Sequence, residues 1–577
     1  MTGSTIRRLM KSIRPHWAAL TLVLILSTVN VALTLYVPIL IGRGVDMIAG
    51  AGAVRFDLLT RVILAIVLAL AGTAAAQWAA SLVINRVAYN VTREIRAKAF
   101  EALGRVPIKY IDGHRHGDIL SRLVTDVDQI SDGLLLGFAQ FFVSGLSILG
   151  TIGFMLSING WIALIVIVVT PLSLFVAKFL AARTYEFFKR QSQVRGEMTG
   201  LVNELVGGQK LVDTFRYQKK ASERFEDVNV RLQSAGVSAV FYSSITNPAT
   251  RFVNSVVYLS VTVFGAFAAL GGALTIGQLT SFLNYASQYT KPFNEISGVI
   301  TELQSALASA ARVFELIDAP PETPDAPDAV EIDRAAGSVN FENLSFSYQP
   351  DRPLIEGLNL SASPGERVAI VGPTGSGKTT LINLLMRFYE PDAGSILVDG
   401  KSETAYTRES LRRQFGMVLQ ETWLREGTIR ENIAYGRPDA TDDEIAAAAR
   451  AAHAEGFILR LPEGYDTVVR EDGEGISQGQ KQLLAIARAM LITPPIMILD
   501  EATSSIDALT ERRVQRAFQR MMAGRTSFVV AHRLETIREA DLILVMDNGR
   551  VVEKGTHDEL IKKNGFYAGL YFSQFSA

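Results

Sequence analysis

The chain has 577 residues, a net charge of −1 at pH 7 and no cysteine. This length is too great for one hydrophobic core, so two or more domains are expected. The balanced charge gives no support to a nucleic-acid partner, and without cysteine neither a disulfide bond nor a cysteine-ligated metal site can form. Such a composition suits a protein that faces the cytosol.

The N-terminal segment from Thr5 to Arg14 is short, basic and amphipathic, and a long uncharged run follows it. This segment is expected to lie on the inner surface of a membrane. A plain anchor that obeys the positive-inside rule is the alternative. A cleaved signal peptide fits worse, because the run 17–42 is far longer than a signal core and lacks a small-residue cleavage site.

Four uncharged runs predict membrane-spanning helices, which need about 20 residues each. These runs are 17–42, 62–85, 133–177 and 252–290. The last two are of double length and carry turn signals near their middles, at 157–160 and 271–272, so each predicts a hairpin and the total is six spans. Lys and Arg concentrate in 86–132 and 178–251, which places both termini in the cytoplasm.

The two long inner loops keep a helical pattern. The first extension, 85–105, has neither Gly nor Pro before Gly104 and would project about 30 Å beyond the membrane. A break is predicted at Pro107, and a second reversal is predicted near 211–223. Both loop tips are therefore placed to touch a cytosolic domain.

No Asp, Glu, Lys or Arg lies in the core of any predicted span, so the sequence shows no proton relay within the membrane. The energy that drives function must come from elsewhere. Polar side chains in the spans could line a path, but for any one of them a hydrogen bond between helices is the preferred interpretation. These residues are Asn30, Gln77, Gln140, Asn254, Asn284 and Gln288.

The composition changes after Ile317, where an acidic, proline-rich segment begins. It predicts a linker at 318–338. A membrane all-α domain of six transmembrane helices with long cytoplasmic extensions is therefore expected at 1–317. At 339–577, short β-rich runs alternate with helical ones, as in an α/β nucleotide-binding domain with a mainly parallel sheet.

A complete phosphate-binding motif, G-x-x-x-x-G-K-[ST], lies in the second domain. Its residues are Gly372, Pro373, Thr374, Gly375, Ser376, Gly377, Lys378 and Thr379, and Thr380 follows them. A strand is predicted before it at 367–371 and a helix after it at 380–385, which is the context of a P-loop and argues against a chance match. Glycines let the backbone wrap phosphate oxygens, Lys378 adds a mobile cation, and Thr379 offers a hydroxyl to Mg²⁺.

Two carboxylates follow the predicted apolar strand 496–499. Asp500 can hold the Mg²⁺ shell, and Glu501 can orient or deprotonate a water in line with the γ-phosphate. An isolated Asp-Glu pair would mean little. Together with a complete P-loop upstream, a functional role is preferred to a structural one.

A third motif opens a predicted helix at Ser477. Gln480 stands three residues later and completes a capping-box pattern. A capped helix start is also an anion site, but on physical grounds alone an ordinary capped helix is the preferred interpretation.

These three motifs, in this order after six predicted spans, resemble the ATP-binding cassette exporters, specifically half-transporters with one membrane domain and one nucleotide-binding domain. The resemblance covers nearly the whole chain. It implies that the loop tips near 108–120 and 211–223 are coupling helices that dock on nucleotide-binding domains.

The resemblance also implies roles for residues that the physical arguments leave open. Tyr348 would stack on adenine, and Gln420 would contact Mg²⁺ and sense the membrane domain. Asp507 would close the D-loop. His532 would contact the γ-phosphate beside Glu501, although an ordinary surface histidine is the better interpretation without the resemblance.

In this family two nucleotides are sandwiched between two chains, so a dimer is implied. The signature that faces ATP bound by the partner would comprise Ser477, Gln478, Gly479 and Gln480. Gln478 replaces the usual Gly and Ile476 replaces Leu. With its acid at Glu501 intact, the chain looks most like the catalytically complete member of bacterial heterodimeric multidrug exporters, which favours a heterodimer over a homodimer.

The resemblance thus implies ATP-driven export of amphipathic or hydrophobic small molecules, drugs or lipids, across the cytoplasmic membrane by alternating access, with ATP and Mg²⁺ as cofactors. A lipid flippase and an importer of a chelate-type nutrient are alternatives on the same frame. An ATP-gated channel is disfavoured by the intact Glu501, and a soluble cassette protein is excluded by the six predicted spans.

Overall fold

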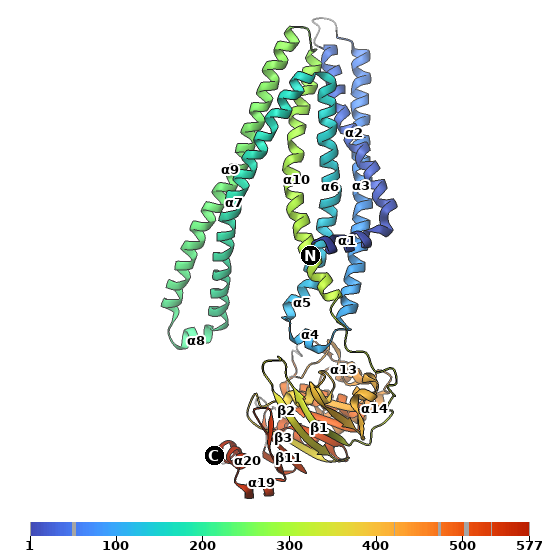
Figure 1. The fold of residues 1–577 in the computed structure, drawn as a ribbon, viewed down its shortest axis with the longest axis vertical. Helices are drawn as coiled ribbons and strands as arrows, with labels where there is room; N and C mark the ends of the chain where they lie inside the picture. Colours follow the sequence, from blue (N-terminus) through green and yellow to red (C-terminus); the bar gives the residue numbers. More distant parts are fainter. Residues whose placement is uncertain are drawn as a thin grey trace. The chain divides into compact units, whose positions relative to one another are not determined.

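A computed structural model of the chain describes residues 2–48, 54–419, 422–470, 475–500, 507–531 and 534–575. The chain divides into two compact units, Met1–Gly104 with Arg115–Ala319 and Arg105–His114 with Pro320–Ala577. Where it is described, the first unit is helical, and the second contains every described strand (Figure 1). The expected fold class, a transmembrane helical domain followed by an α/β nucleotide-binding domain, is confirmed.

Six long helices make up most of the first unit, and the six predicted spans fall on them, one span to each helix. They are α2 (Trp17–Ile48), α3 (Phe56–Leu103), α6 (Thr125–Ile158), α7 (Gly160–Gly207), α9 (Gln218–Leu270) and α10 (Ile276–Ile317). Short helices complete the unit: α1 (Thr2–Ile13), η1 (Arg14–His16), α5 (His116–Leu123) and α8 (Gln209–Thr214). Among the described residues, three segments are long and apolar enough to cross a membrane: Ser4–Ile48, Phe56–Leu103 and Gln140–Ile158.

Both predicted hairpin turns are present. Between α6 and α7, the Asn159 side chain accepts hydrogen bonds from the backbone N–H groups of Trp161 and Ile162 at 3.1 and 3.2 Å. Between α9 and α10, Thr275 and Gln278 form a capping box at the first turn of α10. Side-chain oxygens therefore satisfy N–H groups that would otherwise lack partners where each second helix begins.

Polar side chains bond between the long helices, as the preferred interpretation of the sequence requires. The Asn30 amide on α2 donates to Gln77 on α3, and Gln140 on α6 donates to the Glu295 carboxylate on α10 at 2.6 Å. The Asn284 amide instead donates to a carbonyl one turn earlier on α10 at 2.9 Å. In a membrane such bonds replace those that water would supply.

Helix α10 continues beyond the uncharged run 252–290 and carries Glu295, whose carboxylate accepts hydrogen bonds from Gln140 and Ser144 at 2.6 and 3.1 Å. An uncharged run ends at the first charged residue, whereas helix α10 continues beyond it. The predicted run therefore does not include Glu295, although this acid contacts Gln140 in another predicted span. The side chain of Asn254 lies outside the described residues.

The second unit is built on a six-stranded sheet of order β12-β11-β3-β10-β9-β6. Its strands are β3 (Arg367–Val371), β6 (Phe415–Val418), β9 (Ile496–Asp500), β10 (Thr526–Val530), β11 (Leu542–Asp547) and β12 (Arg550–Gly555). All neighbouring pairs are parallel except β11 and β12, which run antiparallel. The predicted mainly parallel sheet is therefore confirmed.

A second sheet, of order β2-β1-β4-β5, is antiparallel throughout. Its strands are β1 (Val339–Phe346), β2 (Ile355–Ala362), β4 (Ala393–Val398) and β5 (Lys401–Ser402). A two-stranded ribbon pairs β7 (Gly427–Thr428) with β8 (Val468–Val469). The alternation of strands and helices in the sequence does not distinguish this antiparallel sheet from the parallel one.

The helices of the second unit include α4, which comes from within the first half of the chain. They are α4 (Ile108–Asp112), α11 (Lys378–Leu385), α12 (Arg408–Arg412), α13 (Ile429–Ile433), α14 (Asp442–Ala451), α15 (Glu455–Ile458), α16 (Gln478–Ile492), α17 (Ala508–Met522), α18 (Leu534–Arg538), α19 (His557–Lys563) and α20 (Phe566–Phe575). Single 3-10 turns occur at η2 (Glu403–Ala405), η3 (Ala434–Gly436) and η4 (Gly464–Asp466).

The parallel sheet is buried on both faces, as expected of parallel strands. On β3, Val368 and Ile370 belong to one core, which they share with α11 and the antiparallel sheet. Ala369 and Val371 belong to the other core, which they share with α14, α16 and α17. Helices α11 and α16 therefore pack on opposite faces of the sheet.

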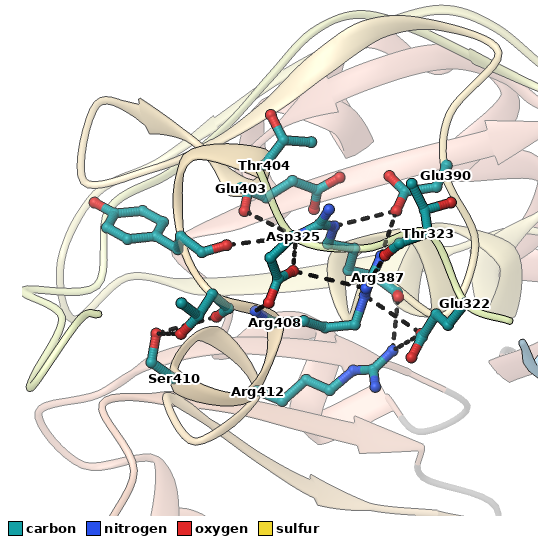
Figure 2. A network of polar contacts seen from close by, with 12 residues as sticks. Glu322, Thr323, Asp325, Arg387, Glu390, Glu403, Thr404, Arg408, Ser410 and Arg412 are labelled. Atoms are coloured by element: carbon teal, nitrogen blue, oxygen red, sulfur yellow. Dashed lines mark hydrogen bonds and ion pairs between the residues drawn. The ribbon is translucent and has the colours of Figure 1, made fainter. Parts of the chain in front are cut away.

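The acidic segment that follows α10 packs on the second unit through buried arginines (Figure 2). The side chains of Arg387 and Arg408 are only 3% and 9% exposed, and both lie within 3.7 Å of the Asp325 carboxylate. Arg408 also contacts Glu322 at 3.3 Å and Glu390 at 2.7 Å. The segment predicted as a linker therefore has fixed, charged partners.

Glu403 lies within this network, and both of its carboxylate oxygens are buried without a hydrogen-bond partner among the described residues. Burial is the largest cause of a pKa of about 8 for Glu403, and the charge of nearby Glu390 also raises this pKa. The charges of Arg387 and Arg408 lower it. The unfolded chain loses this proton at a lower pH than the folded chain. Stability is therefore lost as pH rises from the unfolded pKa to about 8.

We expect Glu403→Gln to raise the free energy of unfolding by about 3 kcal/mol at pH 7 and by much less near pH 5, because the amide cannot ionise. Thermal unfolding of the purified chain at several pH values measures this. Exposed Glu342→Gln serves as the control and should leave the pH dependence unchanged. A Glu403→Gln effect of the same size at every pH would contradict the assignment.

Candidate functional site

The phosphate-binding motif forms the turn between β3 and α11. Gly375 and Gly377 have φ values of 84° and 98°, a left-handed conformation that glycine adopts readily. A Cβ on Gly372 would lie 2.1 Å from the Met546 carbonyl oxygen, so the backbone passes too close there for any side chain. The buried Ser376 hydroxyl has no hydrogen-bond partner among the described residues. A tight glycine cradle with an unsatisfied buried donor fits a phosphate ligand.

Lys378 begins α11 and turns back onto the same loop. Its Nζ donates to the carbonyl oxygens of Gly372 and Pro373 at 2.8 and 2.9 Å, and the residue is 8% exposed. Burial lowers the pKa of Lys378, while the charge of Asp500 acts in the opposite direction. A phosphate in the cradle would supply the strong negative partner that two neutral carbonyls do not.

The strand ends bring a second part of the site to the same edge. Asp500 ends β9 in register with Val530 of β10, and Val530 is in register with Ile370 of β3. On the other side of β9, Leu499 is in register with Val418 of β6. The carboxyl ends of these strands are where ligands of open parallel sheets bind. The sheet thus delivers Asp500 to the edge at which the P-loop begins.

Three predicted site residues, Gln420, Glu501 and His532, lie outside the described residues. In sequence, each comes shortly after the described end of β6, β9 or β10, respectively. Their assigned roles remain predictions.

Tyr348 lies in the turn between β1 and β2, beside the P-loop helix. Its ring packs edge-on against Phe346 and Tyr389, with centroid distances of 5.0 and 5.1 Å. Its hydroxyl lies 3.2 Å from the Thr380 hydroxyl on α11, and 40% of the residue remains exposed. A held, partly exposed aromatic ring at this place can stack on a nucleotide base.

Tyr389, which no sequence motif identifies, links Tyr348 to α4. Its hydroxyl donates to the Asp112 carboxylate at 2.5 Å, and Asp112 is the last residue of α4. Burial raises the pKa of Tyr389, and the hydrogen bond to Asp112 adds to this shift. Tyr389 and Asp112 lie 277 positions apart in the chain, and no sequence pattern connects them.

We expect Tyr389→Phe to loosen α4 from the second unit. A hydrogen bond to a charged group contributes about 1.5 kcal/mol, so amide exchange at 108–112 should become about tenfold faster. Hydrogen–deuterium exchange on the purified chain measures this. Tyr406→Phe is the matched control, since it removes a buried hydroxyl that donates to the Val398 carbonyl at 3.2 Å. Unchanged exchange in α4 after Tyr389→Phe would refute the link.

The signature segment has the capping box that its sequence predicts. The Ser477 hydroxyl accepts from the Gln480 N–H at 3.3 Å, and the Gln480 side chain accepts from the Ser477 N–H at 3.0 Å. Gly479 is buried in the first turn of α16, whereas Ser477 and Gln478 are exposed. The start of α16 therefore presents both exposed side chains to solvent.

Asp507 caps α17, with its carboxylate accepting from the N–H groups of Leu509 and Thr510 at 3.1 and 3.0 Å. The backbone hydrogen bond from Thr510 is the first cause of a lowered pKa for Asp507. A lowered pKa keeps this side chain ionised, which suits both a helix cap and the D-loop role expected of it.

The P-loop and the signature do not pack on the same side of the cassette. The P-loop continues into α11, in the core with the antiparallel sheet, whereas Ser477 opens α16, in the core on the other face. The sheet therefore stands between the two helices that carry these motifs.

Comparisons with known proteins agree with this arrangement. Residues 20–293 match the family described as the ABC transporter transmembrane region, and residues 355–504 match the family described as ABC transporter. Among solved structures, a bacterial Atm1-family ABC exporter with ATP bound is similar, with a TM-score of 0.76 and 28% sequence identity. That similarity covers 98% of this chain and 99% of the other.

Two relatives extend the comparison. The chain is 43% identical over 525 residues to the fatty acid ABC transporter ATP-binding/permease protein of Mycobacterium bovis, covering 91% of this chain and 83% of that protein. It is 34% identical over 571 residues to the ATP-dependent lipid A-core flippase of Syntrophus aciditrophicus, covering 99% of this chain and 94% of that protein.

Proposed function

Because the chain belongs to the ATP-binding cassette exporters and couples ATP hydrolysis to transport, we propose that it exports amphipathic or hydrophobic small molecules across the cytoplasmic membrane. The observation that carries the proposal is a P-loop cradle in the same chain as six long helices. The distribution of Lys and Arg supports a cytoplasmic location for both termini and the nucleotide-binding domain.

Lipids are the second, narrower candidate for the cargo. Both curated relatives described above are transporters or flippases of molecules with acyl chains. Drugs and lipids share an apolar body with a polar end, so the wider class of amphipathic molecules includes both.

Within each ATP site, Lys378 and the glycine cradle would bind the phosphates, and Tyr348 would stack on the adenine. Thr379, Asp500 and Gln420 would hold Mg²⁺, which neutralises charge on the phosphates when it is bound. Glu501 would orient the attacking water and accept its proton, and His532 would contact the γ-phosphate. The buried Ser376 hydroxyl, which has no hydrogen-bond partner in the described part of the chain, supports this assignment of the phosphates.

We infer that the working unit is a dimer, in which the start of α16 from one chain faces ATP held by the other. The placement of α11 and α16 on opposite faces of the sheet supports this inference. The exposed Gln478, where the family usually has Gly, favours a heterodimer with one weakened site.

Flux in inside-out membrane vesicles tests the direction and class of transport. We expect a fluorescent fatty acid and a cationic amphipathic dye each to accumulate in the vesicle lumen on addition of ATP. Accumulation of only one of them would indicate a narrower cargo class. Vesicles with Lys378→Ala serve as the control. ATP-driven depletion of the vesicle lumen would instead identify an importer.

Expression of this chain alone tests the heterodimer. We expect low ATP turnover that rises several-fold in the Gln478→Gly variant, because the typical signature residue is then restored in both sites. Gln480→Gly in the same first turn is a control that should not raise turnover, since it removes the capping partner of Ser477. Robust, substrate-stimulated turnover by the unmodified homodimer would refute the heterodimer.

A further inference from the structure

An apolar cavity of about 290 Å³ lies where the N-terminal helix meets the first two long helices. Its lining comes from α1, α2 and α3 and comprises Met10, Ile13, Trp17, Leu20, Thr21, Leu24, Ile84, Val87, Ala88 and Val91. At about 30 Å³ for a group the size of a water molecule, the cavity could hold roughly ten methylene groups. Its volume therefore suits part of one acyl chain.

The chemistry of the lining points to a hydrocarbon occupant. Ala88 and Val91 on α3 are 1% and 0% exposed and belong to the buried wall, whereas Trp17 is 59% exposed. Only Thr21 and the indole N–H of Trp17 bring polar groups to the lining, and the Thr21 hydroxyl already donates to the Trp17 carbonyl at 2.9 Å. An occupant therefore needs no hydrogen-bonding group inside the cavity, and water gains none there.

Helix α1 is held in place by a residue that does not line the cavity. Arg8 forms an ion pair with Asp318 and lies 4.4 Å from the centroid of the Phe314 ring on α10. Figure 1 shows α1 lying across the long helices near α3 and α10. A basic amphipathic helix in that orientation belongs in the interfacial plane of a bilayer.

Two cations of the N-terminal segment stand directly beside lining residues in the chain, and Arg86 of α3 stands beside a third lining residue, Val87. Lys11 follows Met10, and Arg14 follows Ile13. Lys11 and Arg14 are exposed, and neither has an ion pair within the part of the chain that the structure describes. Arg8 is paired with Asp318, whereas Lys11 and Arg14 remain available to an anionic group.

We propose that this cavity is a binding site for an anionic phospholipid of the surrounding bilayer. One acyl chain would enter between α1, α2 and α3, and the headgroup phosphate would pair with Lys11 and Arg14. An apolar cavity with exposed cations adjacent to its lining in the chain suits both ends of such a lipid, and a basic amphipathic helix such as α1 lies at headgroup level. The site does not depend on the identity of the transported cargo.

Quenching of Trp17 fluorescence by bromine-labelled lipids tests the proposal directly. Trp78, Trp161 and Trp423 would be replaced by phenylalanine in the full-length chain, which leaves Trp17 as the sole tryptophan. This chain would be reconstituted into phosphatidylcholine vesicles with a small fraction of dibrominated phosphatidylglycerol or dibrominated phosphatidylcholine. At equal fraction, we expect phosphatidylglycerol to be preferred roughly thirtyfold, from two cations near the surface.

Two variants separate the headgroup from the acyl chain. Lys11→Gln with Arg14→Gln should abolish the preference, whereas Arg55→Gln with Arg61→Gln, on the far side of the first two spans, should preserve it. Ala88→Leu should weaken quenching by both lipids, because it fills the cavity, while the exposed Leu82→Ala should not. Each variant would first be matched to the parent by its thermal unfolding.

Three results would overturn the proposal. Equal quenching by the two lipids would mean that Trp17 senses only bulk bilayer. An anionic preference that survives Lys11→Gln with Arg14→Gln would place the headgroup elsewhere. Stronger quenching by a brominated free fatty acid than by phosphatidylglycerol would identify a fatty-acid site instead. None of these results bears on ATP-driven transport, which the vesicle flux measures separately.

Discussion

Replacing Glu501 with glutamine is expected to lower ATP turnover of the assembled transporter by about 10²- to 10³-fold, in the range of a lost general base. Glutamine keeps the shape of the side chain but cannot accept the proton of the attacking water. Glu501 follows directly on Asp500, which the buried strand β9 brings to the P-loop edge of the sheet. ATP should therefore still bind, and the closed, ATP-loaded state should accumulate.

Phosphate release measures the turnover of this variant, and retention of labelled ATP after rapid gel filtration measures the trapped state. Glu463→Gln, an exposed acid in the same domain, is the matched control and should behave as the parent. If Glu501→Gln turned over at the normal rate, Glu501 could not be the proton acceptor.

Replacing Lys378 with alanine is expected to weaken ATP binding itself, by roughly 10- to 100-fold, because charge-assisted hydrogen bonds to phosphate are lost. Lys378 donates to the Gly372 and Pro373 carbonyl oxygens at 2.8 and 2.9 Å. These bonds are to neutral oxygens, and the ammonium is buried, so transfer to phosphate is favourable.

A fluorescent ATP analogue titrated into the purified protein measures the affinity. Lys401→Ala, at an exposed lysine on β5, controls for the loss of a positive charge in the domain. Lys378→Met keeps much of the side-chain volume and separates lost binding from lost packing. Normal ATP affinity in both Lys378 variants would contradict the P-loop assignment.

Local sequence signals predicted much of this fold. Asn159 and Thr275 cap the helices that follow the two hairpin turns, and the Ser477–Gln480 box is present as its spacing predicts. The P-loop glycines adopt the positive φ values that the motif requires. Each of these features depends on residues within a few positions of one another, where sequence spacing and spatial distance agree.

Features that depend on distant residues could not be predicted. Tyr389 meets Asp112 across 277 positions, and Gln140 meets Glu295 across 155. The acidic segment after α10 resembles a free spacer by composition, yet Asp325 pairs with buried Arg387. Nothing in the composition of such a segment identifies which arginines its carboxylates will meet.

The grouping of Arg105–His114 with the second unit has a mechanical consequence. The polypeptide passes between the two units at three places, after Gly104, after His114 and after Ala319. A chain that crossed once would leave the two units free to reorient about one junction, whereas three crossings restrict such reorientation. Cutting the backbone at one junction, while leaving the other two whole, should therefore weaken the mechanical coupling between the two units without separating them.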